Sequence, residues 1–200
     1  HTVQAGKILA ANDNMWLGYH LKRKKVKEYK RNLGLSSDFD YFNCGVLALQ
    51  RETMDDMFPK ALEFFLKNSQ ICAYHDQSAL NAVFAGRREV LSPLYNFISD
   101  YYLLNVLGDA NPALLHFTGG GKPWAYDGPP WGNKFLASYP YIIENNPGLS
   151  AYAKIFDPGK SADELNYYNR RRSFYRKAVP IYLLRRSRFL RYMRKSNFSC

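Results

Sequence analysis

Residues His116 to Trp124 place a histidine, three consecutive glycines and a lysine directly after an apolar run. Glycines allow backbone amides to close around phosphate oxygens, and a lysine neutralises the charge of those oxygens. A histidine can ligate a divalent cation that bridges the same phosphates. The order differs from G-x-x-x-x-G-K-[ST] and from the glycine pattern of a dinucleotide-binding turn. The stretch predicts a diphosphate site with His116 and Lys122 as charged members, and a flexible turn beside a buried histidine is the alternative.

A second polar interruption lies at Asn43, Cys44 and Gly45, inside an apolar stretch. An unpaired buried amide costs ~1–3 kcal/mol, so Asn43 needs a partner. A glycine inside a strand pattern marks a β-bulge or the close approach of a ligand. Two interpretations stay open: a bulge in which Asn43 bonds to nearby backbone, or a ligand that approaches Gly45 and hydrogen-bonds Asn43.

The third stretch, His75 to Asn81, places carboxylate and amide side chains where a helix is expected to begin. Asp76 occupies the expected N-cap position, and Gly86 is expected to end the helix. These polar groups are either a cap alone or a ligand site. Side chains at a helix N-terminus converge on a polar ligand together with free backbone N–H groups.

The elements that must position these residues alternate between strands and helices. Short buried strands are expected at Lys7–Ala11, Asp38–Gln50 (interrupted), Glu89–Leu91 and Ala113–Phe117. Residues 21–35 are basic and predict a solvated helix or loop that Gly34 closes. A helix is expected around Ala61 with Pro59 in its first turn, and two or three helices finish the chain. This alternation predicts an α/β layer structure.

Taken together and in this order, the three stretches resemble glycosyltransferase family 8, which includes bacterial lipopolysaccharide galactosyl- and glucosyltransferases and glycogenin. The family pattern F-N-[AS]-G-V is similar to Phe42–Val46, D-Q-x-x-L-N to Asp76–Asn81, and H-[FY]-x-G-x-x-K-P-W to His116–Trp124. The resemblance runs from about Lys7 to Trp131. It implies an α/β GT-A fold, present as an N-terminally truncated fragment.

The resemblance also implies a retaining, metal-dependent hexosyltransferase. Such an enzyme moves a hexose from UDP-galactose or UDP-glucose to a saccharide or lipid-linked saccharide, in the synthesis of lipopolysaccharide or another cell-surface glycan. Its implied catalytic residues are Asp76, which lines the donor sugar, and Gln77, which lies near the anomeric carbon. Its implied binding residues are Asn43, Cys44 and Gly45 for the sugar, Gly119 and Lys122 for the diphosphate, and His116 for Mn²⁺.

Three departures from the family pattern stand out. Cys44 replaces Ala or Ser, and Ser78 replaces a second Asp. The family's Asp-x-Asp metal motif is absent before Lys7, and Asp38-Phe39-Asp40, in the wrong place for it, is interpreted as a loop. Because the chain begins with His1, we expect a cut N-terminus. Because one histidine cannot hold a catalytic metal, the fragment alone is expected to be inactive.

The net charge of +11 is concentrated near the C-terminus. Residues 170–195 hold eleven of the 28 Lys and Arg residues and no acid, so the remaining cations equal the 17 acidic residues in number. Val179–Lys195 predicts a helix that lies on an anionic membrane surface. Its apolar side consists of Ile181, Tyr182, Phe189, Leu190, Tyr192 and Met193. We expect a catalytic part at 1–160, a helical tail at 161–200, and a cytoplasmic, peripheral location at the inner face of the membrane.

Two other classes of function stay open. The interleaved Arg and Tyr residues of the tail are compatible with a nucleic-acid-binding module, but a neutral body makes a nucleic-acid partner unexpected. A non-catalytic, glycan-binding relative is the other alternative, and a glycogenin-like enzyme leaves the tail without a role. Cys44, Cys72 and Cys200 follow no disulfide or metal spacing, which favours a reducing compartment.

Overall fold

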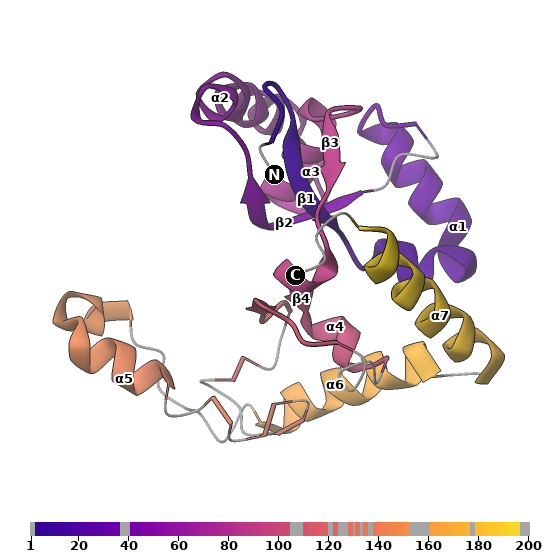
Figure 1. Ribbon diagram of the computed structural model, residues 1–200, viewed down its shortest axis with the longest axis vertical. Coiled ribbons are helices and arrows are strands. Elements are labelled where there is room, and N and C mark those ends of the chain that lie inside the picture. The colour runs from indigo at the N-terminus through magenta and orange to yellow at the C-terminus, as the bar shows by residue number, and fades with distance from the viewer. Residues whose placement is uncertain are drawn as a thin grey trace. The chain divides into compact units, whose positions relative to one another are not determined.

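The computed structural model describes residues 3–36, 41–104, 110–119, 122–123, 128–129, 131–132, 134–135, 138–152, 161–176 and 179–196. These residues form two units along the chain (Figure 1). The first unit comprises the described residues of His1–Phe97, Asn111–Leu114 and Ser187–Cys200. The second comprises those of Ile98–Ala110 and Leu115–Arg186.

A three-stranded sheet lies at the centre of the first unit, in the order β2-β1-β3. The strands are β1 (Ile8–Asn12), β2 (Phe42–Ala48) and β3 (Arg88–Val90), with β1 antiparallel to β2 and parallel to β3. All of β1 is buried, as expected for a central strand whose sequence is almost wholly apolar. The predicted strands in these three regions are confirmed.

The pairing of β1 with β2 is interrupted. Ala10 pairs with Leu47 and Asn12 pairs with Phe42, so β2 carries extra residues between two consecutive pairs of β1. An extra segment in one strand is the signature of a β-bulge. The bulge contains Asn43 to Gly45, where the sequence predicted an interruption.

The first unit contains α1 (Met15–Asn32), α2 (Arg51–Asn68), α3 (His75–Val83) and the C-terminal part of the last helix, α7 (Val179–Lys195). A short 3₁₀ turn, η1 (Ser69–Ile71), follows α2. Helix α3 contacts both α2 and β2. The core between them is formed by Ile8, Ala10, Phe42, Met57, Ala61, Ala79, Leu80 and Phe84.

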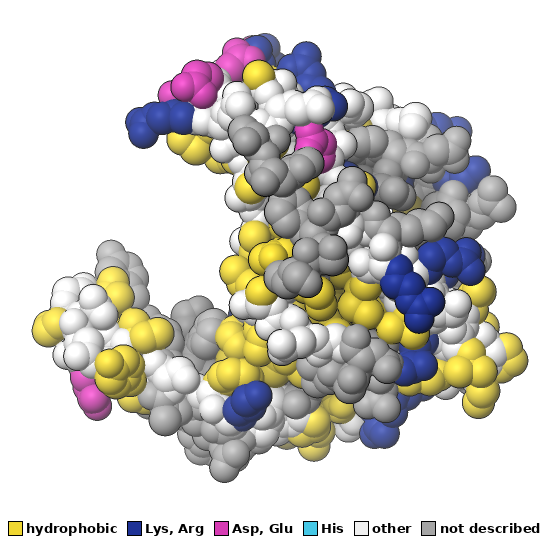
Figure 2. Space-filling model, viewed as in Figure 1, with side chains coloured by type: hydrophobic (Ala, Val, Ile, Leu, Met, Phe, Trp, Pro, Cys, Tyr) yellow, Lys and Arg dark blue, Asp and Glu magenta, His cyan; other side chains and the backbone are white. Residues whose placement is uncertain are grey.

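Pro59 lies in the interior of α2, so its predicted place in the first turn is wrong. The helix begins at Arg51, and exposed charged pairs at helical spacing support its first half, among them Arg51 with Asp55 and Asp56 with Lys60. Such pairs are worth a few tenths of a kcal/mol each, and Pro59 removes one backbone donor. Figure 2 shows Lys, Arg, Asp and Glu side chains together on the surface of α2.

The second unit contains α4 (Ser99–Tyr102), β5 (Leu115–His116), α5 (Ser138–Asn145), η4 (Pro147–Tyr152), α6 (Ser161–Arg176) and part of α7 (Val179–Lys195). Strand β4 (Phe97–Ile98), preceded by η2 (Pro93–Tyr95), leads into this unit and pairs with β5. Trp131 is buried among rings, with Tyr102 at 4.4 Å and Phe117 at 4.8 Å between centroids. Edge-to-face packing of this kind stabilises a small core.

Helix α7 has the predicted bounds, but part of its predicted membrane-facing side packs inside the protein. Phe189 is fully buried, and its ring meets that of Phe97 edge-to-face with centroids 5.9 Å apart. The Tyr182 hydroxyl donates to the Leu104 carbonyl at 2.9 Å. The physical reason is that these rings gain more by completing a core than by facing solvent.

The exposed apolar side chains of α7 are a different set, namely Val179, Leu183 and Leu184. Arg185 is fully buried, where it donates to the Phe174 carbonyl at 2.7 Å and stands 4.7 Å from the centre of that ring. Among the described residues, no helix has both the length and the apolar character needed to cross a bilayer.

Candidate functional site

The start of α3 carries Asp76, but Asp76 is not the N-cap. Tyr74 precedes the helix, and Asp76 lies within its first turn, which makes the N-cap prediction wrong. The physical reason is His75, which adopts a left-handed φ of 48° and turns the chain into the helix early. The Ser78 hydroxyl accepts the Tyr74 N–H at 2.9 Å and holds this turn.

Gln77 is the centre of a buried polar cluster. Its Oε1 accepts the backbone N–H of Cys44 at 3.1 Å and the Asn43 amide at 3.2 Å. Its Nε2 donates to the Asp13 carboxylate at 3.1 Å, and Asn43 donates to the same oxygen at 3.4 Å. Because both ends of the Gln77 amide are bonded, its orientation is fixed before any ligand arrives.

Asn43 organises the bulge of β2. Its Oδ1 accepts the Gly45 N–H at 3.0 Å and the Asn96 side-chain amide at 2.9 Å. The interpretation as a bulge in which Asn43 bonds nearby backbone is therefore confirmed. Gly45 is exposed at this point. The approach of a ligand to Gly45 stays a prediction.

Cys44 faces Asp76 across the site, and its Sγ–H donates to the Asp76 carboxylate at 3.5 Å. Burial raises the pKa of the Cys44 thiol to about 12, and the charge of Asp76 raises it further in the same direction. The thiol is therefore protonated at neutral pH. It acts as a small, weak donor and not as a nucleophile.

Asp13 belongs to this cluster although its position had not been singled out from the sequence. It directly follows the last residue of β1 and is 7% exposed. Its backbone N–H donates a hydrogen bond to the Tyr41 carbonyl at 2.9 Å. The sequence signal for Asp13 is a carboxylate directly after a strand that is almost wholly apolar. The signal is ambiguous, because the run Asn12-Asp13-Asn14 also fits an ordinary turn.

Three tyrosines support the start of α3 from behind. Tyr29 stands 5.7 Å from both Tyr41 and Tyr74 between ring centroids, and its hydroxyl shares a 2.6 Å hydrogen bond with Ser78. Burial raises the pKa values of Tyr29 and Tyr41. Ser78 is fully buried among them, so this departure from the family pattern has a structural role.

In the second unit, His116 and Lys122 form a second group of candidate site residues. Burial lowers the pKa of His116, and the charge of Lys122 lowers it further. The ammonium group of Lys122 donates to the Phe117 carbonyl. A neutral imidazole beside an ammonium group is suited to an anionic ligand such as a phosphate.

Gly119 has a φ of +74°, and a Cβ built on it would lie 3.0 Å from the Tyr167 hydroxyl. The left-handed φ favours glycine here, and a side chain would in addition press against Tyr167. Gly120, Gly121 and Trp124, which complete the predicted phosphate loop, lie outside the described residues. The Asp38-Phe39-Asp40 prediction also lies outside them.

The described residues do not by themselves fit a metal ion. They include no group of three His, Cys, Asp or Glu side chains placed to share one cation. His116 supplies one nitrogen, whereas a divalent ion such as Mn²⁺ needs several further ligands.

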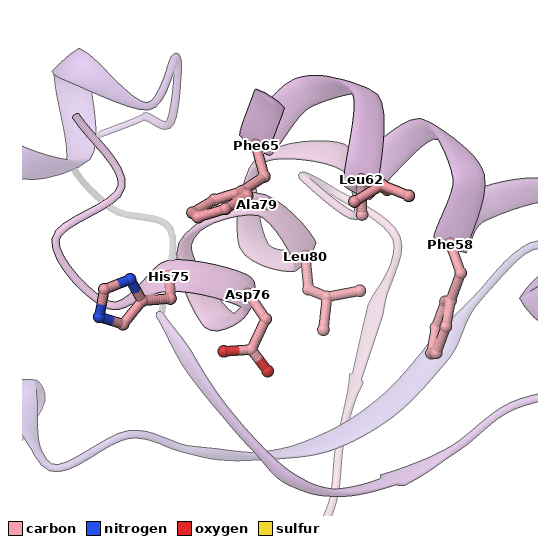
Figure 3. Close-up of a pocket in the computed structure, with 8 residues that line it drawn as sticks. Phe58, Leu62, Phe65, His75, Asp76, Ala79 and Leu80 are labelled. Carbon is pink, nitrogen blue, oxygen red and sulfur yellow. The ribbon is translucent and has the colours of Figure 1, made fainter. Parts of the chain in front are cut away.

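An apolar cavity of about 420 Å³ lies between α2 and α3. Figure 3 shows Phe58, Leu62 and Phe65 on one side, and His75 and Asp76 at the start of α3. Its lining is mostly apolar and suits no highly charged ligand. Asp76 therefore stands between this cavity and the polar cluster around Gln77.

The predicted site residues form two sets, one in each unit. Asn43, Cys44, Gly45, Asp76 and Gln77 come together in the first unit, joined by Asp13. His116, Gly119 and Lys122 lie in the second unit. The carboxylates and amides of the first set can hydrogen-bond hydroxyl groups of a ligand. The second set provides an ammonium group and an imidazole.

The fold has the α/β GT-A architecture of glycosyltransferases. The solved galactosyltransferase LgtC, crystallised with donor and acceptor sugar analogs, is similar with a TM-score of 0.53 and 23% identity over 69% of this chain and 52% of LgtC. An active-site mutant of LgtC gives a TM-score of 0.51 over 66% of this chain and 50% of that protein. At this identity the likeness establishes the fold.

The family profile described as Glycosyl transferase family 8 matches residues 4–128, and the chain belongs to this family. A Haemophilus influenzae protein named "Putative glycosyltransferase" is 29% identical over 107 residues, which cover 50% of this chain and 32% of that protein. General stress protein A of Bacillus subtilis is 28% identical over 114 residues, covering 48% of this chain and 40% of that protein. The chain thus spans well under half the length of these curated relatives.

Proposed function

We propose that this chain is the part of a retaining hexosyltransferase that binds the sugar and the diphosphate of a UDP-sugar. The observation that carries the proposal is the cluster in which Gln77 is fixed by Asp13, Asn43 and Cys44, with Asp76 exposed beside it. Membership of glycosyl transferase family 8 supports it.

At the sugar end, the exposed Asp76 carboxylate accepts hydrogen bonds from hydroxyl groups of the hexose. Gln77 lies next to Asp76 and carries a dipole whose direction its partners fix. Positive charge develops at the anomeric carbon in an oxocarbenium-like transition state. A fixed dipole near that carbon stabilises the charge without reorganisation, which is the role we assign to Gln77.

At the diphosphate end, Lys122 offsets the negative charge that develops on the leaving UDP. Gly119 brings backbone close to the phosphate oxygens, because its left-handed conformation and the nearby Tyr167 hydroxyl exclude a side chain. His116, with its lowered pKa, presents a neutral nitrogen at neutral pH. We assign it as a single ligand of Mn²⁺, with the other ligands supplied from outside the described residues.

We propose UDP-galactose or UDP-glucose as donor, and a saccharide or lipid-linked saccharide of a cell-surface glycan such as lipopolysaccharide as acceptor. If the acceptor is such a glycan, the enzyme acts at the inner face of a membrane. The second unit exposes the apolar side chains of Val179, Leu183 and Leu184 and, on α6, cations that include Arg170 and Arg172. Exposed apolar side chains and cations on one unit suit an anionic lipid surface, where each cation contributes about 1 kcal/mol.

Hydrolysis of UDP-glucose and UDP-galactose with Mn²⁺, measured in the full-length protein that carries this chain, tests the catalytic proposal. We expect Lys122→Ala to lower the rate about 100-fold, the usual loss for one transition-state donor. Lys134→Ala, at an exposed lysine of the same unit, is the matched control and should leave the rate unchanged. Equal rates in wild type and His116→Ala would overturn the metal assignment. Sugar binding without hydrolysis would favour a glycan-binding relative.

Sedimentation with phosphatidylglycerol vesicles tests the membrane proposal. Leu183→Glu with Leu184→Glu should weaken binding, while Tyr141→Glu with Ile142→Glu on the exposed face of α5 should not. Equal binding to phosphatidylcholine vesicles would contradict the proposal. A salt-sensitive shift with RNA, and none with vesicles, would favour a nucleic-acid partner.

A further inference from the structure

The C-terminal part of α7 belongs to the first unit, together with the sheet. The same unit holds the side chains that we assign to the sugar, here called the sugar-facing cluster: Asp13, Asn43, Cys44, Asp76 and Gln77. Phe189 anchors it there with no exposed surface, against the equally buried Phe97. Tyr192 lies three residues further along the helix and therefore projects from nearly the same face. The side chain that follows the anchor is thus held against the sheet.

The hydroxyl of Tyr192 sits between the ends of β1 and β3. It donates to the Leu91 carbonyl at 2.7 Å and accepts the Asn12 backbone N–H at 2.8 Å. Leu91 itself donates its N–H to the Ala10 carbonyl at 3.1 Å, which is the last rung of the parallel ladder.

In a parallel ladder the next rung would join the Asn12 N–H directly to the Leu91 carbonyl. The Tyr192 hydroxyl takes the place of that rung and satisfies both groups. The two strands separate where the hydroxyl enters. Asp13, the next residue, leaves the sheet from this point.

Asp13 is therefore positioned by the residue before it. Asn12 is held at its backbone by Tyr192 and at its side chain by Arg88, whose guanidinium donates to Oδ1 at 2.6 Å. With Asn12 held in this way, the Asp13 carboxylate accepts a hydrogen bond from the Gln77 side-chain amide at 3.1 Å. A shift of Asn12 would therefore move Asp13 through the peptide bond between them, and Asp13 would move Gln77 through their hydrogen bond.

We propose that Tyr192 is a positioning residue for the sugar-facing cluster: its hydroxyl replaces a rung between β1 and β3 and thereby sets the place of Asp13 and the orientation of Gln77. The C-terminal helix is then part of the site's framework, in addition to any contact it makes with a membrane. This inference rests on the proposed function only where it assigns the cluster to a sugar ligand. The positioning of Asp13 and Gln77 by Tyr192 is a property of the fold.

Tyr192→Phe tests the proposal because it removes one oxygen and keeps the ring. Tyr182→Phe is the matched control, since that hydroxyl on the same helix also donates to a backbone carbonyl, at Leu104 in the second unit. Amide hydrogen exchange and side-chain amide NMR signals are measured in the 200-residue chain. We expect Asn12 to exchange about fivefold faster or more in Tyr192→Phe, the loss of roughly one hydrogen bond, and the Gln77 side-chain signals to shift.

Tyr182→Phe should leave both Asn12 and Gln77 unchanged. Unmoved Gln77 signals in a folded Tyr192→Phe variant would overturn the proposal. Should that variant not fold, the wild type decides: a slowly exchanging Asn12 amide supports the bridge, and exchange at the rate of an open chain overturns it. Titration of the full-length protein with UDP-glucose and UDP-galactose separates the two claims. A Gln77 shift without sugar binding leaves the positioning role standing and removes the proposed function.

Discussion

The side-chain amide of Gln77 donates a 3.1 Å hydrogen bond to the carboxylate of Asp13, a residue 64 positions earlier in the chain. The pair joins the first turn of α3 to the end of β1. The other end of the Gln77 amide accepts the Cys44 N–H, so one side chain links three elements of the first unit. A change of its charge should therefore be felt in stability as well as in function.

Gln77→Glu should destabilise the chain by about 1–3 kcal/mol at pH 8, because two buried carboxylates would face each other and a donor would be lost. One of the pair then acquires a folded-state pKa above its unfolded value of about 4.3. Stability that depends on such a raised pKa is present at low pH and is lost as pH rises. The difference from wild type, measured by urea unfolding, should shrink from pH 8 to pH 5.

Asp13→Asn combined with Gln77→Glu supplies the control, because it restores one amide and one carboxylate with their places exchanged. The double variant should recover most of the lost stability. A single variant whose penalty does not change with pH would contradict the close contact of the two groups.

The thiol of Cys44 should react slowly with iodoacetamide at pH 8.5. Its pKa of about 12 leaves very little thiolate at that pH. Asp76→Asn removes the negative charge that opposes the thiolate, so alkylation of Cys44 should become about three- to tenfold faster, which corresponds to a half to one pKa unit. Peptide mass spectrometry follows each cysteine separately.

Cys72 is the internal control for this experiment, because burial alone raises its pKa and no carboxylate contributes. Its rate should not respond to Asp76→Asn. A Cys44 that reacts like a free thiol in the wild type would show that the contact with Asp76 is absent in solution.

Local patterns in the sequence were sufficient for much of the fold. The apolar run at Ile8–Asn12 predicts a buried strand, and Val179–Lys195 predicts a helix, because burial and backbone periodicity are properties of neighbouring residues. Pro59 misled the prediction of α2, since a proline suits a first turn but is also tolerated further along when charged pairs support the helix. His75 was equally unpredictable, because a left-handed φ at a residue other than glycine is uncommon.

Motifs in the sequence identified Asn43, Cys44, Asp76 and Gln77, but they revealed neither Asp13 nor the hydrogen bonds that join these side chains. Asp13 meets Gln77 only because the sheet order places β1 beside β2. The apolar side of α7 was assigned to a membrane because a helix pattern does not distinguish lipid from a protein core. Phe189 and Tyr192 meet the first unit through contacts that are remote in sequence.

Lys122→Met should raise the pKa of His116, since the neighbouring positive charge is one of the two causes that lower it. The pKa of His116 should stay below the ordinary histidine value, because burial is the larger cause of the lowering and remains in this variant. Lys122→Arg keeps the charge and should leave the value close to that of the wild type. Titration of the imidazole signals by NMR measures all three proteins, and an unchanged value in Lys122→Met would contradict the pairing.

The same lowered pKa has a consequence for stability. As pH falls below the ordinary histidine value of about 6.5, the unfolded chain takes up a proton that the folded chain does not. Stability should therefore fall between that pH and the lower folded-state pKa. His116→Asn should flatten this part of the curve of unfolding free energy against pH.

Asn81 should be the most costly residue of the second motif to replace, although we assign it no contact with a substrate. It is fully buried, and its amide accepts the Phe42 N–H at 2.9 Å while donating to the Phe42 and Gln77 carbonyls at 2.9 and 2.8 Å. Asn81→Ala removes the side-chain partner of the Phe42 N–H and carbonyl and one of the bonds to the Gln77 carbonyl, so we expect a loss of about 2–4 kcal/mol in urea unfolding.

Asn81→Asp separates the donor from the acceptor, because a carboxylate can still accept from Phe42 but cannot donate to either carbonyl. It should cost at least as much as Asn81→Ala at pH 8. Asn68→Ala provides the comparison, since Asn68 donates to the Phe64 carbonyl from a partly exposed place at the end of α2 and should cost less than about 1 kcal/mol. Equal losses at the two asparagines would show that Asn81 does not tie β2 to α3 beside Gln77.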